Sequence, residues 1–236
     1  MNFCKMAAAL PVILVAALTI TTANAADGHQ PMEWHFDVAL DGKPIGYHTF
    51  DVRHDGPRQI LTTEASFDVK FLFITAFRYR HQNTEIWADG CLSSIDAKTD
   101  SNGKVYDVRG NAQDDVFDLS GNAASTSLKS DCIQTFAYWN PSILEARRLL
   151  NSQTGEYEDI STMLEGYESI EVDGQQIAAA RYRLSAKAGD IRLWYSRDDQ
   201  TWLALEAPAK GGRTIRYSAV RLPTITPADG IVATTD

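Results

Sequence analysis

The sequence predicts an all-β protein, a curved antiparallel meander or half-open β-barrel with one or two short helices. Three observations predict this fold class. Apolar and polar residues alternate with a period of two along most of the chain. Turn signals, among them Asp-Gly and Asn-Gly pairs, recur roughly every 8–15 residues. Helical periodicity is clear at one place only. A chain of 236 residues is long enough to bury its own core without a metal.

The N-terminal segment, residues 1–25, has the features of a secretory signal peptide. Lys5 supplies a positive charge, residues 6–20 form an apolar run, and residues 23–25 (Ala-Asn-Ala) form a small-residue cleavage site. The apolar run is shorter than the ~20 residues that a membrane-spanning helix needs. We therefore expect a mature chain that begins at Ala26, works in the periplasm or outside the cell, and makes no stable membrane insertion.

The first expected strand shows the alternation most clearly, with Trp34, Phe36, Val38 and Leu40 on one face and polar side chains on the other. Residues 41–44 form a turn, and residues 45–54 return as the second strand. Further strands are expected, in order, over residues 58–77, 78–88, 91–98, 105–108, 116–119, 167–172, 176–186, 191–196, 201–206 and 213–222.

One segment departs from the strand pattern. Asn140 is a good N-cap and Pro141 a good first helical residue, and apolar side chains follow at helical spacing, so the sequence predicts a short covering helix over residues 141–150. A weaker pattern over residues 160–164 is compatible with a second helical turn. No composition shift marks an internal boundary, so we expect a single β domain over residues 26–222 and a flexible tail over residues 223–236.

Charge and cysteine usage restrict the partners and the compartment. The net charge of −9 argues against nucleic acid and anionic membrane surfaces, which both require clustered cations. Cys4 lies in the signal segment, which leaves Cys91 and Cys132. Two cysteines in an exported chain usually pair, and closing this loop would stabilise the protein by roughly 4 kcal/mol.

The most apolar stretch of the mature chain is residues 69–77. It is either a central strand buried on both faces or the lining of a hydrophobic ligand cavity. Bulky aromatic side chains elsewhere would form further walls of such a cavity, although they also suit an ordinary β core. The predicted ligand-binding residues are Phe71, Phe73, Phe77, Tyr79, Trp87, Trp139 and Trp194.

The histidines and the known motifs give no catalytic or metal site. A two-residue turn would place His35 opposite His48, and a four-residue turn would place Asp37 opposite His48; in both cases the pair lies on the polar face. A metal site needs three or four ligands, and no third is evident. The sequence contains no nucleophile elbow, zinc-protease motif, P-loop or dinucleotide fingerprint. We therefore predict no catalytic residue, no metal and no cofactor.

Two regions resemble an uncharacterised family of exported bacterial proteins, a domain of unknown function. Residues 40–46 (LDGKPIG) resemble its first hairpin, and residues 193–196, 202–206, 211–212 and 215–217 resemble its ending. The likeness extends over most of residues 33–221. It implies a strongly bent antiparallel sheet, similar to the half-barrel of periplasmic lipoprotein carriers, in which a concave apolar face holds acyl chains under a helical lid. The family supplies no catalytic residue to transfer.

The leading hypothesis is an exported, non-enzymatic protein that binds a hydrophobic, lipid-like ligand on the concave face of its sheet. One alternative is an enzyme acting on a lipid or aromatic small molecule at the same cleft, and it requires three or more of its suspected residues to converge. Those residues are Asp68, Arg78, Arg80, His81 and Glu85. A second alternative is an envelope scaffold with a large exposed apolar patch. The sequence specifies no oligomeric state.

Overall fold

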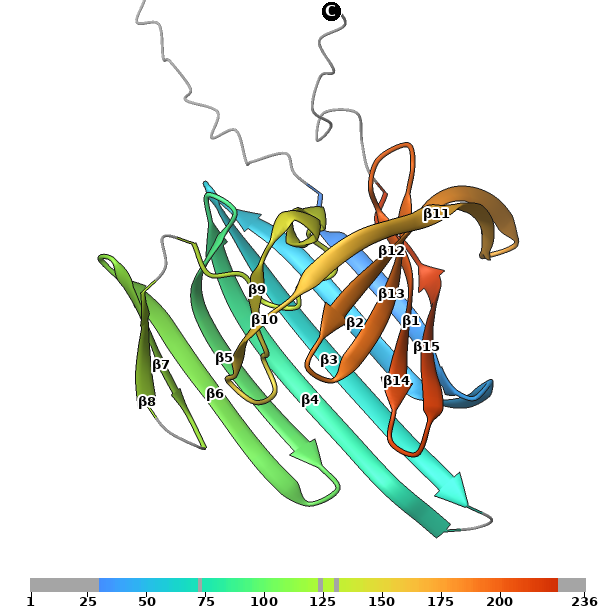
Figure 1. The fold of residues 1–236 in the computed structure, drawn as a ribbon, viewed down its shortest axis with the longest axis horizontal. Coiled ribbons are helices and arrows are strands. Elements are labelled where there is room, and N and C mark those ends of the chain that lie inside the picture. Colours follow the sequence, from blue (N-terminus) through green and yellow to red (C-terminus); the bar gives the residue numbers. More distant parts are fainter. Residues whose placement is uncertain (1–29, 72–73, 123–124, 130–131, 225–236) are drawn as a thin grey trace, which may run out of the picture.

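A computed structural model describes residues 30–71, 74–122, 125–129 and 132–224 (Figure 1). Thirteen strands form one antiparallel sheet in the order β11-β12-β13-β14-β15-β1-β2-β3-β4-β5-β6-β7-β8. The sheet does not close, because β11 and β8 remain its two edges. The predicted fold class, a curved antiparallel sheet or half-open barrel, is confirmed. The proposed signal peptide and residues 225–236 of the proposed tail lie outside the described residues.

The two halves of the chain each form a meander of consecutive strands. The first half comprises β1 (Met32–Leu40), β2 (Lys43–Asp55), β3 (Arg58–Phe71), β4 (Ile74–Ala88), β5 (Cys91–Ser101), β6 (Lys104–Gln113), β7 (Val116–Gly121) and β8 (Ser125–Lys129). The second half comprises β11 (Ser161–Val172), β12 (Gln175–Ala186), β13 (Gly189–Ser196), β14 (Trp202–Ala209) and β15 (Arg213–Arg221). Pairing of β15 with β1 joins the halves.

Tight turns make this meander possible. Two-residue hairpin turns of the favoured type need positive φ at both central residues, which Asp, Asn and Gly tolerate best. The structure has positive φ at both residues of four such pairs that the sequence had marked as turns. These pairs are Asp41-Gly42, Asp89-Gly90, Asn102-Gly103 and Asp173-Gly174.

A bulge in the first hairpin changes which face its side chains occupy. Ala39 pairs with Pro44, but Val38 pairs with Gly46, which leaves Ile45 as an extra residue in β2. This register lies between the two that the sequence suggested. His48 therefore pairs with Phe36 and points to the concave face, so its predicted place on the polar face was wrong. A one-residue shift moves every later side chain to the opposite face.

The concave face of the sheet is covered by residues 132–160, which we call the covering segment. It contains the 3₁₀ helix η1 (Pro141–Glu145) and a small hairpin of β9 (Arg148–Leu150) and β10 (Tyr157–Asp159), and it lies in front of the sheet in Figure 1. Most of the hydrophobic core lies between this segment and the sheet. The largest fully buried side chains there include Phe36, Leu61, Trp87, Ile143, Leu149, Leu150, Tyr195 and Trp202.

The covering segment is not the helix that the sequence predicted over residues 141–150. The Asn140 side chain does cap the helix, but the helix ends at Glu145. Arg148–Leu150 instead pairs with Tyr157–Asp159 as a strand. Tertiary pairing here outweighs a weak local preference. The second helical turn suggested for residues 160–164 is also a strand, the beginning of β11.

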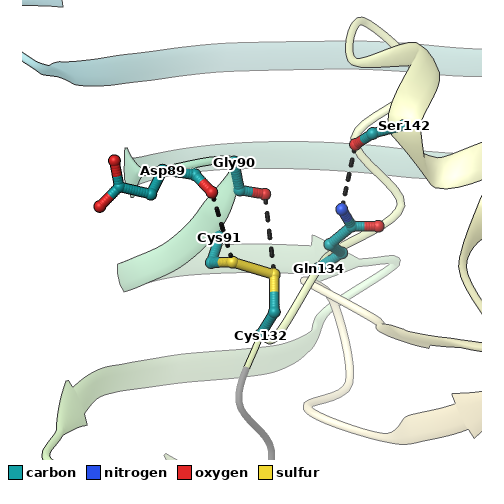
Figure 2. Close-up of a disulfide and its surroundings, with 6 residues drawn as sticks. All are labelled: Asp89, Gly90, Cys91, Cys132, Gln134 and Ser142. Carbon is teal, nitrogen blue, oxygen red and sulfur yellow. Dashed lines mark hydrogen bonds between the residues drawn. A yellow bond between two sulfur atoms is a disulfide. The ribbon is translucent and has the colours of Figure 1, made fainter.

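The predicted disulfide is present between Cys91 and Cys132 (Figure 2). It joins the first residue of β5 to the start of the covering segment. The next residue of β5 continues this attachment, since the N–H of Leu92 donates to the carbonyl of Ile133 at 2.8 Å. The disulfide therefore anchors one end of the covering segment to the sheet.

We predict that replacing both cysteines, Cys91→Ser with Cys132→Ser, lowers the free energy of unfolding by about 4 kcal/mol. The physical reason is the greater entropy of an unfolded chain without a closed loop of 41 residues. Urea titration of both proteins measures the difference. Equal midpoints for the variant and the oxidised wild type would contradict this role.

We also predict that Gly46→Ala lowers the free energy of unfolding by about 3 kcal/mol or more. Gly46 has a φ of 150°, and an added Cβ would overlap the carbonyl oxygen of Ser66 on β3. Gly42→Ala is the matched control, because Gly42 also has positive φ but open space around it. Its cost should be about 1 kcal/mol of backbone strain. Similar losses for both variants would show that the close approach of β2 to β3 is unimportant.

Candidate functional site

One face of β4 carries a graded row of side chains that points to the concave side of the sheet. Every second residue belongs to the row, because side chains of a strand alternate between its faces. The row is apolar at both ends and polar in the middle. In order, its members are Phe77, Tyr79, His81, Asn83, Glu85 and Trp87. The three central residues are almost completely buried, with exposed fractions of 5% for His81, 4% for Asn83 and 1% for Glu85.

A cavity of about 170 Å³ lies over this polar row, between strands β2–β4 and the covering segment. The sheet and the covering segment contribute the two opposite walls. The sheet supplies His48, Thr63, Tyr79, His81, Asn83 and Glu85, and the covering segment supplies Phe136, Tyr138, Asn151 and Gln153. Of the described residues that line this cavity, none is a lysine or an arginine.

Two histidines of the cavity wall stand on β2 and β4, the two strands that flank β3. Hydrogen bonds join His48 Nε2 to the hydroxyl of Thr63 (2.6 Å) and His48 Nδ1 to the hydroxyl of Tyr217 (3.2 Å). His81 Nδ1 is hydrogen-bonded to the hydroxyl of Thr99 at 2.8 Å. Burial lowers the pKa of His81 to about 4. Burial lowers the pKa of His48 as well, and the neighbouring His81 lowers it further. Both imidazoles are therefore neutral at pH 7.

Glu85 is a buried carboxyl group held by neutral donors. Its Oε1 accepts from Asn83 Nδ2 (2.8 Å), and its Oε2 accepts from Trp87 Nε1 (2.9 Å) and from the hydroxyl of Thr135 (3.1 Å). Burial raises the pKa of Glu85, while these three hydrogen bonds act in the opposite direction. Thr135 belongs to the covering segment, so this carboxyl group also connects the segment to the sheet.

Asn83 leaves one hydrogen-bonding group unused in the cavity wall. Its amide nitrogen is committed to Glu85, and its Oδ1 is buried with no hydrogen-bond partner among the described residues. Buried polar atoms are paired in most proteins, and each exception calls for an explanation. An acceptor without a donor in a cavity wall indicates a place where a ligand group or a water can bind.

Three of the predicted ligand-binding residues lie on the concave face of β4. Tyr79 lines the cavity, and its hydroxyl donates to Gln153 of the covering segment at 3.1 Å. Phe77 lies two residues nearer the start of β4 and is 38% exposed. Trp87 is fully buried and contacts the site through its hydrogen bond to Glu85.

The other predicted residues are placed differently. Trp139 packs edge-to-face on Trp87, with ring centroids 5.7 Å apart, in the core beyond the cavity. Trp194 lies on the outer face of β13, where its indole N–H donates to Glu168 and Arg216 stacks on its ring. Phe73 and the side chain of Phe71 lie outside the described residues.

The stretch over residues 69–77 is not buried on both faces where the structure describes it. Val69 is half-buried, and residues 74–77 are exposed, with Ile74 itself 71% exposed. Its described part therefore lies at an open end of the sheet rather than at its centre.

The residues suspected in the enzyme hypothesis divide between the two faces of the sheet. Asp68 forms ion pairs with Arg78 (3.3 Å) and Arg80 (2.8 Å) on the outer face of β3 and β4. His81 and Glu85 lie in the cavity. The five side chains thus do not converge in one cleft. The described residues also contain no cluster of three or more His, Cys, Asp or Glu side chains that could hold a metal ion.

The sequence profile of the domain of unknown function DUF6134 matches residues 36–220, a range that runs from β1 to β15. The chain belongs to this family. The expected resemblance to an uncharacterised family is thereby confirmed. None of the curated proteins shows significant sequence similarity to this DUF6134 protein. In the part of the chain that the structure describes, no helix is long and apolar enough to cross a membrane.

A solved structure shares the fold of the DUF6134 protein. The crystal structure of a β-barrel-like protein of domain of unknown function DUF1849 from Brucella abortus aligns with a TM-score of 0.60 at 12% identity, over 83% of this chain and 98% of that one. A DUF1329 family protein from Desulfovibrio piger aligns with a TM-score of 0.23 at 12% identity, over 80% and 82% of the two chains. The first of these likenesses shows a shared barrel-like fold.

We predict that His81 makes the folded protein less stable in mild acid. Between pH 6.5 and about 4, the unfolded state binds a proton at His81 that the folded state does not, so stability falls as the pH falls through this window. The loss for His81 between pH 7 and 4.5 is about 2–3 kcal/mol. His48 acts in the same direction, whereas the raised pKa of Glu85 acts in the opposite one.

Comparison of the wild type with His81→Gln isolates this contribution. The free energy of unfolding of each protein is measured by urea titration at several values between pH 4.5 and pH 7. The variant should lose less stability over this range than the wild type. Parallel pH profiles for the two proteins would contradict the assignment of a buried neutral imidazole.

Proposed function

We propose that the mature protein is an exported, non-enzymatic carrier that binds a hydrophobic, lipid-like small molecule on the concave face of its sheet. The observation that supports this most strongly is a continuous apolar strip on β3 and β4. The strip leads from the exposed end of their hairpin to the polar cavity. We call it the apolar strip and define it by Val69, Phe67, Phe77 and Tyr79.

The strand register sets the order of side chains along the strip. Val69 pairs with Phe77, and Phe67 pairs with Tyr79, so two cross-strand pairs follow one another toward the cavity. The rings of Phe67 and Tyr79 are stacked with centroids 5.2 Å apart. The next pair along the strands contains His81, where the polar row begins. Along β3 and β4, the concave face therefore changes from exposed and apolar at the strip to buried and polar at the cavity.

This gradient suits a ligand with a hydrocarbon body and a small polar end. The cavity volume of about 170 Å³ is below the roughly 300–1,000 Å³ of typical small-molecule sites, so the cavity suits one end of such a molecule. The rest of the ligand would lie along the apolar strip. Each methylene that it buries there would contribute about 0.8 kcal/mol of binding free energy.

Two features support an extracytoplasmic location for this carrier. Residues 1–25 have the composition of a cleaved signal peptide. The disulfide between Cys91 and Cys132 is of a kind that persists mainly in oxidising compartments. N-terminal sequencing of the protein recovered from its host should begin at Ala26.

The scaffold function remains a second candidate because of the edge strand β11. This strand is 12 residues long and leaves one side without a strand partner in the sheet. Its exposed large hydrophobic side chains are Met163, Leu164 and Tyr167. Exposed strand edges of this kind can pair with a strand of another protein.

Binding of a neutral fluorescent probe tests the carrier function. N-phenyl-1-naphthylamine should bind the wild-type protein with increased fluorescence. Phe77→Asp should weaken its binding by at least about tenfold, because it places a charge on the apolar strip. Tyr167→Asp is the matched control, since it places the same charge at an exposed aromatic residue on β11. Failure of the wild type to bind the probe, or an equal loss in both variants, would contradict the proposed carrier.

A further inference from the structure

We infer that the cavity recognises a ligand whose polar end donates hydrogen bonds and carries no negative charge, such as an alcohol or an amine. The inference rests on the proposed carrier function and specifies the chemistry of the ligand's polar end. It excludes carboxylates and phosphates as the group that enters the cavity. Unpaired groups in the cavity wall and the charges around them support it independently.

The first support is the unpaired acceptor of Asn83. The amide nitrogen of Asn83 is used by Glu85, because Asn83 Nδ2 donates to Glu85 Oε1 at 2.8 Å. That leaves Oδ1 as a buried acceptor without a donor among the described residues, on a side chain that belongs to the cavity lining. Only a ligand group or water that donates an N–H or O–H can satisfy it.

The second support is the ring of His81. Its Nδ1 is hydrogen-bonded to Thr99, and its Nε2 makes no hydrogen bond with the described residues. His81 and Asn83 are two residues apart on the same face of β4, and both side chains belong to the lining of one cavity. A hydroxyl or amine group can bind to both, because each such group offers a donor and, when neutral, an acceptor as well.

The third support is the charge of the surroundings. The titratable side chains that line the cavity are His48, Tyr79, His81, Glu85 and Tyr138, and the described lining contains no lysine or arginine. An anionic ligand group would therefore be buried near a carboxyl group without a cation to balance it, which is costly. A neutral donor avoids this cost, and a bound ammonium group would favour the ionised form of Glu85 and be attracted by it.

A series of amphiphiles with the same ten-carbon chain tests the inference on the wild-type protein. Decan-1-ol, decylamine and decanoate are each titrated at pH 7 against bound N-phenyl-1-naphthylamine, and displacement of the probe is measured. The alcohol and the amine should bind at least about tenfold more tightly than decanoate. The inference would be overturned by equal affinities, by tighter binding of decanoate, or by no displacement of a bound probe by the alcohol and the amine. Each of these results would leave the carrier function intact. Failure of the probe itself to bind would contradict the carrier function instead.

Two cavity variants test the assigned atoms. Asn83→Leu preserves the approximate side-chain volume and removes the acceptor. It should therefore weaken the binding of decan-1-ol by about tenfold, with little effect on the binding of decanoate. Gln82→Leu, on the outer face of the same strand, is the matched control and should leave all three affinities unchanged. Glu85→Gln should weaken the binding of decylamine more than the binding of decan-1-ol. Unchanged affinity of Asn83→Leu for decan-1-ol would overturn the role of Asn83. The amphiphile series on the wild-type protein tests the inference whether or not a variant folds.

Discussion

The architecture depends on how a sheet that does not close keeps its concave face out of water. In a closed barrel the opposite wall would cover that face, but here β8 and β11 remain apart as edges. The covering segment takes the place of the missing wall. It is attached to the first half of the sheet by the disulfide and by the hydrogen bond from Thr135 to Glu85, and to the second half by the hydrogen bond from Tyr195 to the carbonyl of Tyr138.

The same attachments create the candidate site. The side chain of Glu85 receives donors from β4 and from the covering segment, so the carboxyl group that fixes the cover also fixes the orientation of Asn83. The bulge at Ile45 brings His48 to the concave face, near His81 in the same cavity wall. Packing over the rest of the face is apolar and close, and the cavity lies where polar residues interrupt it. Fold and site therefore share one set of interactions.

The sequence predicts the fold much better than the site, for physical reasons that particular residues illustrate. Alternation and Asp-Gly turns are local signals, so most strands of the large sheet and their hairpins were predictable. The cysteine pair was predictable because an exported chain with two cysteines usually joins them. The face of the sheet on which His48 lies depends on a single bulge. The alternation of apolar and polar residues does not reveal where one extra residue is inserted in a strand. Strand β4 is polar on both faces around Asn83. An analysis of hydrophobic periodicity therefore cannot show which of its two faces is buried. The helix is shorter than the sequence predicts because Leu149 and Leu150 belong to a strand that pairs with β10. No local sequence pattern reveals this pairing.

Native mass spectrometry of the mature protein, purified gently from the envelope of its own host, tests the central claim most directly. The account predicts a bound mass that dissociates on activation and fragments as an amphiphile with a hydrocarbon chain and a hydroxyl or amine end. A clean mass of the free protein, unchanged after exposure to a membrane extract, would contradict a carrier with its site on the concave face. It would shift attention to the exposed edge of β11.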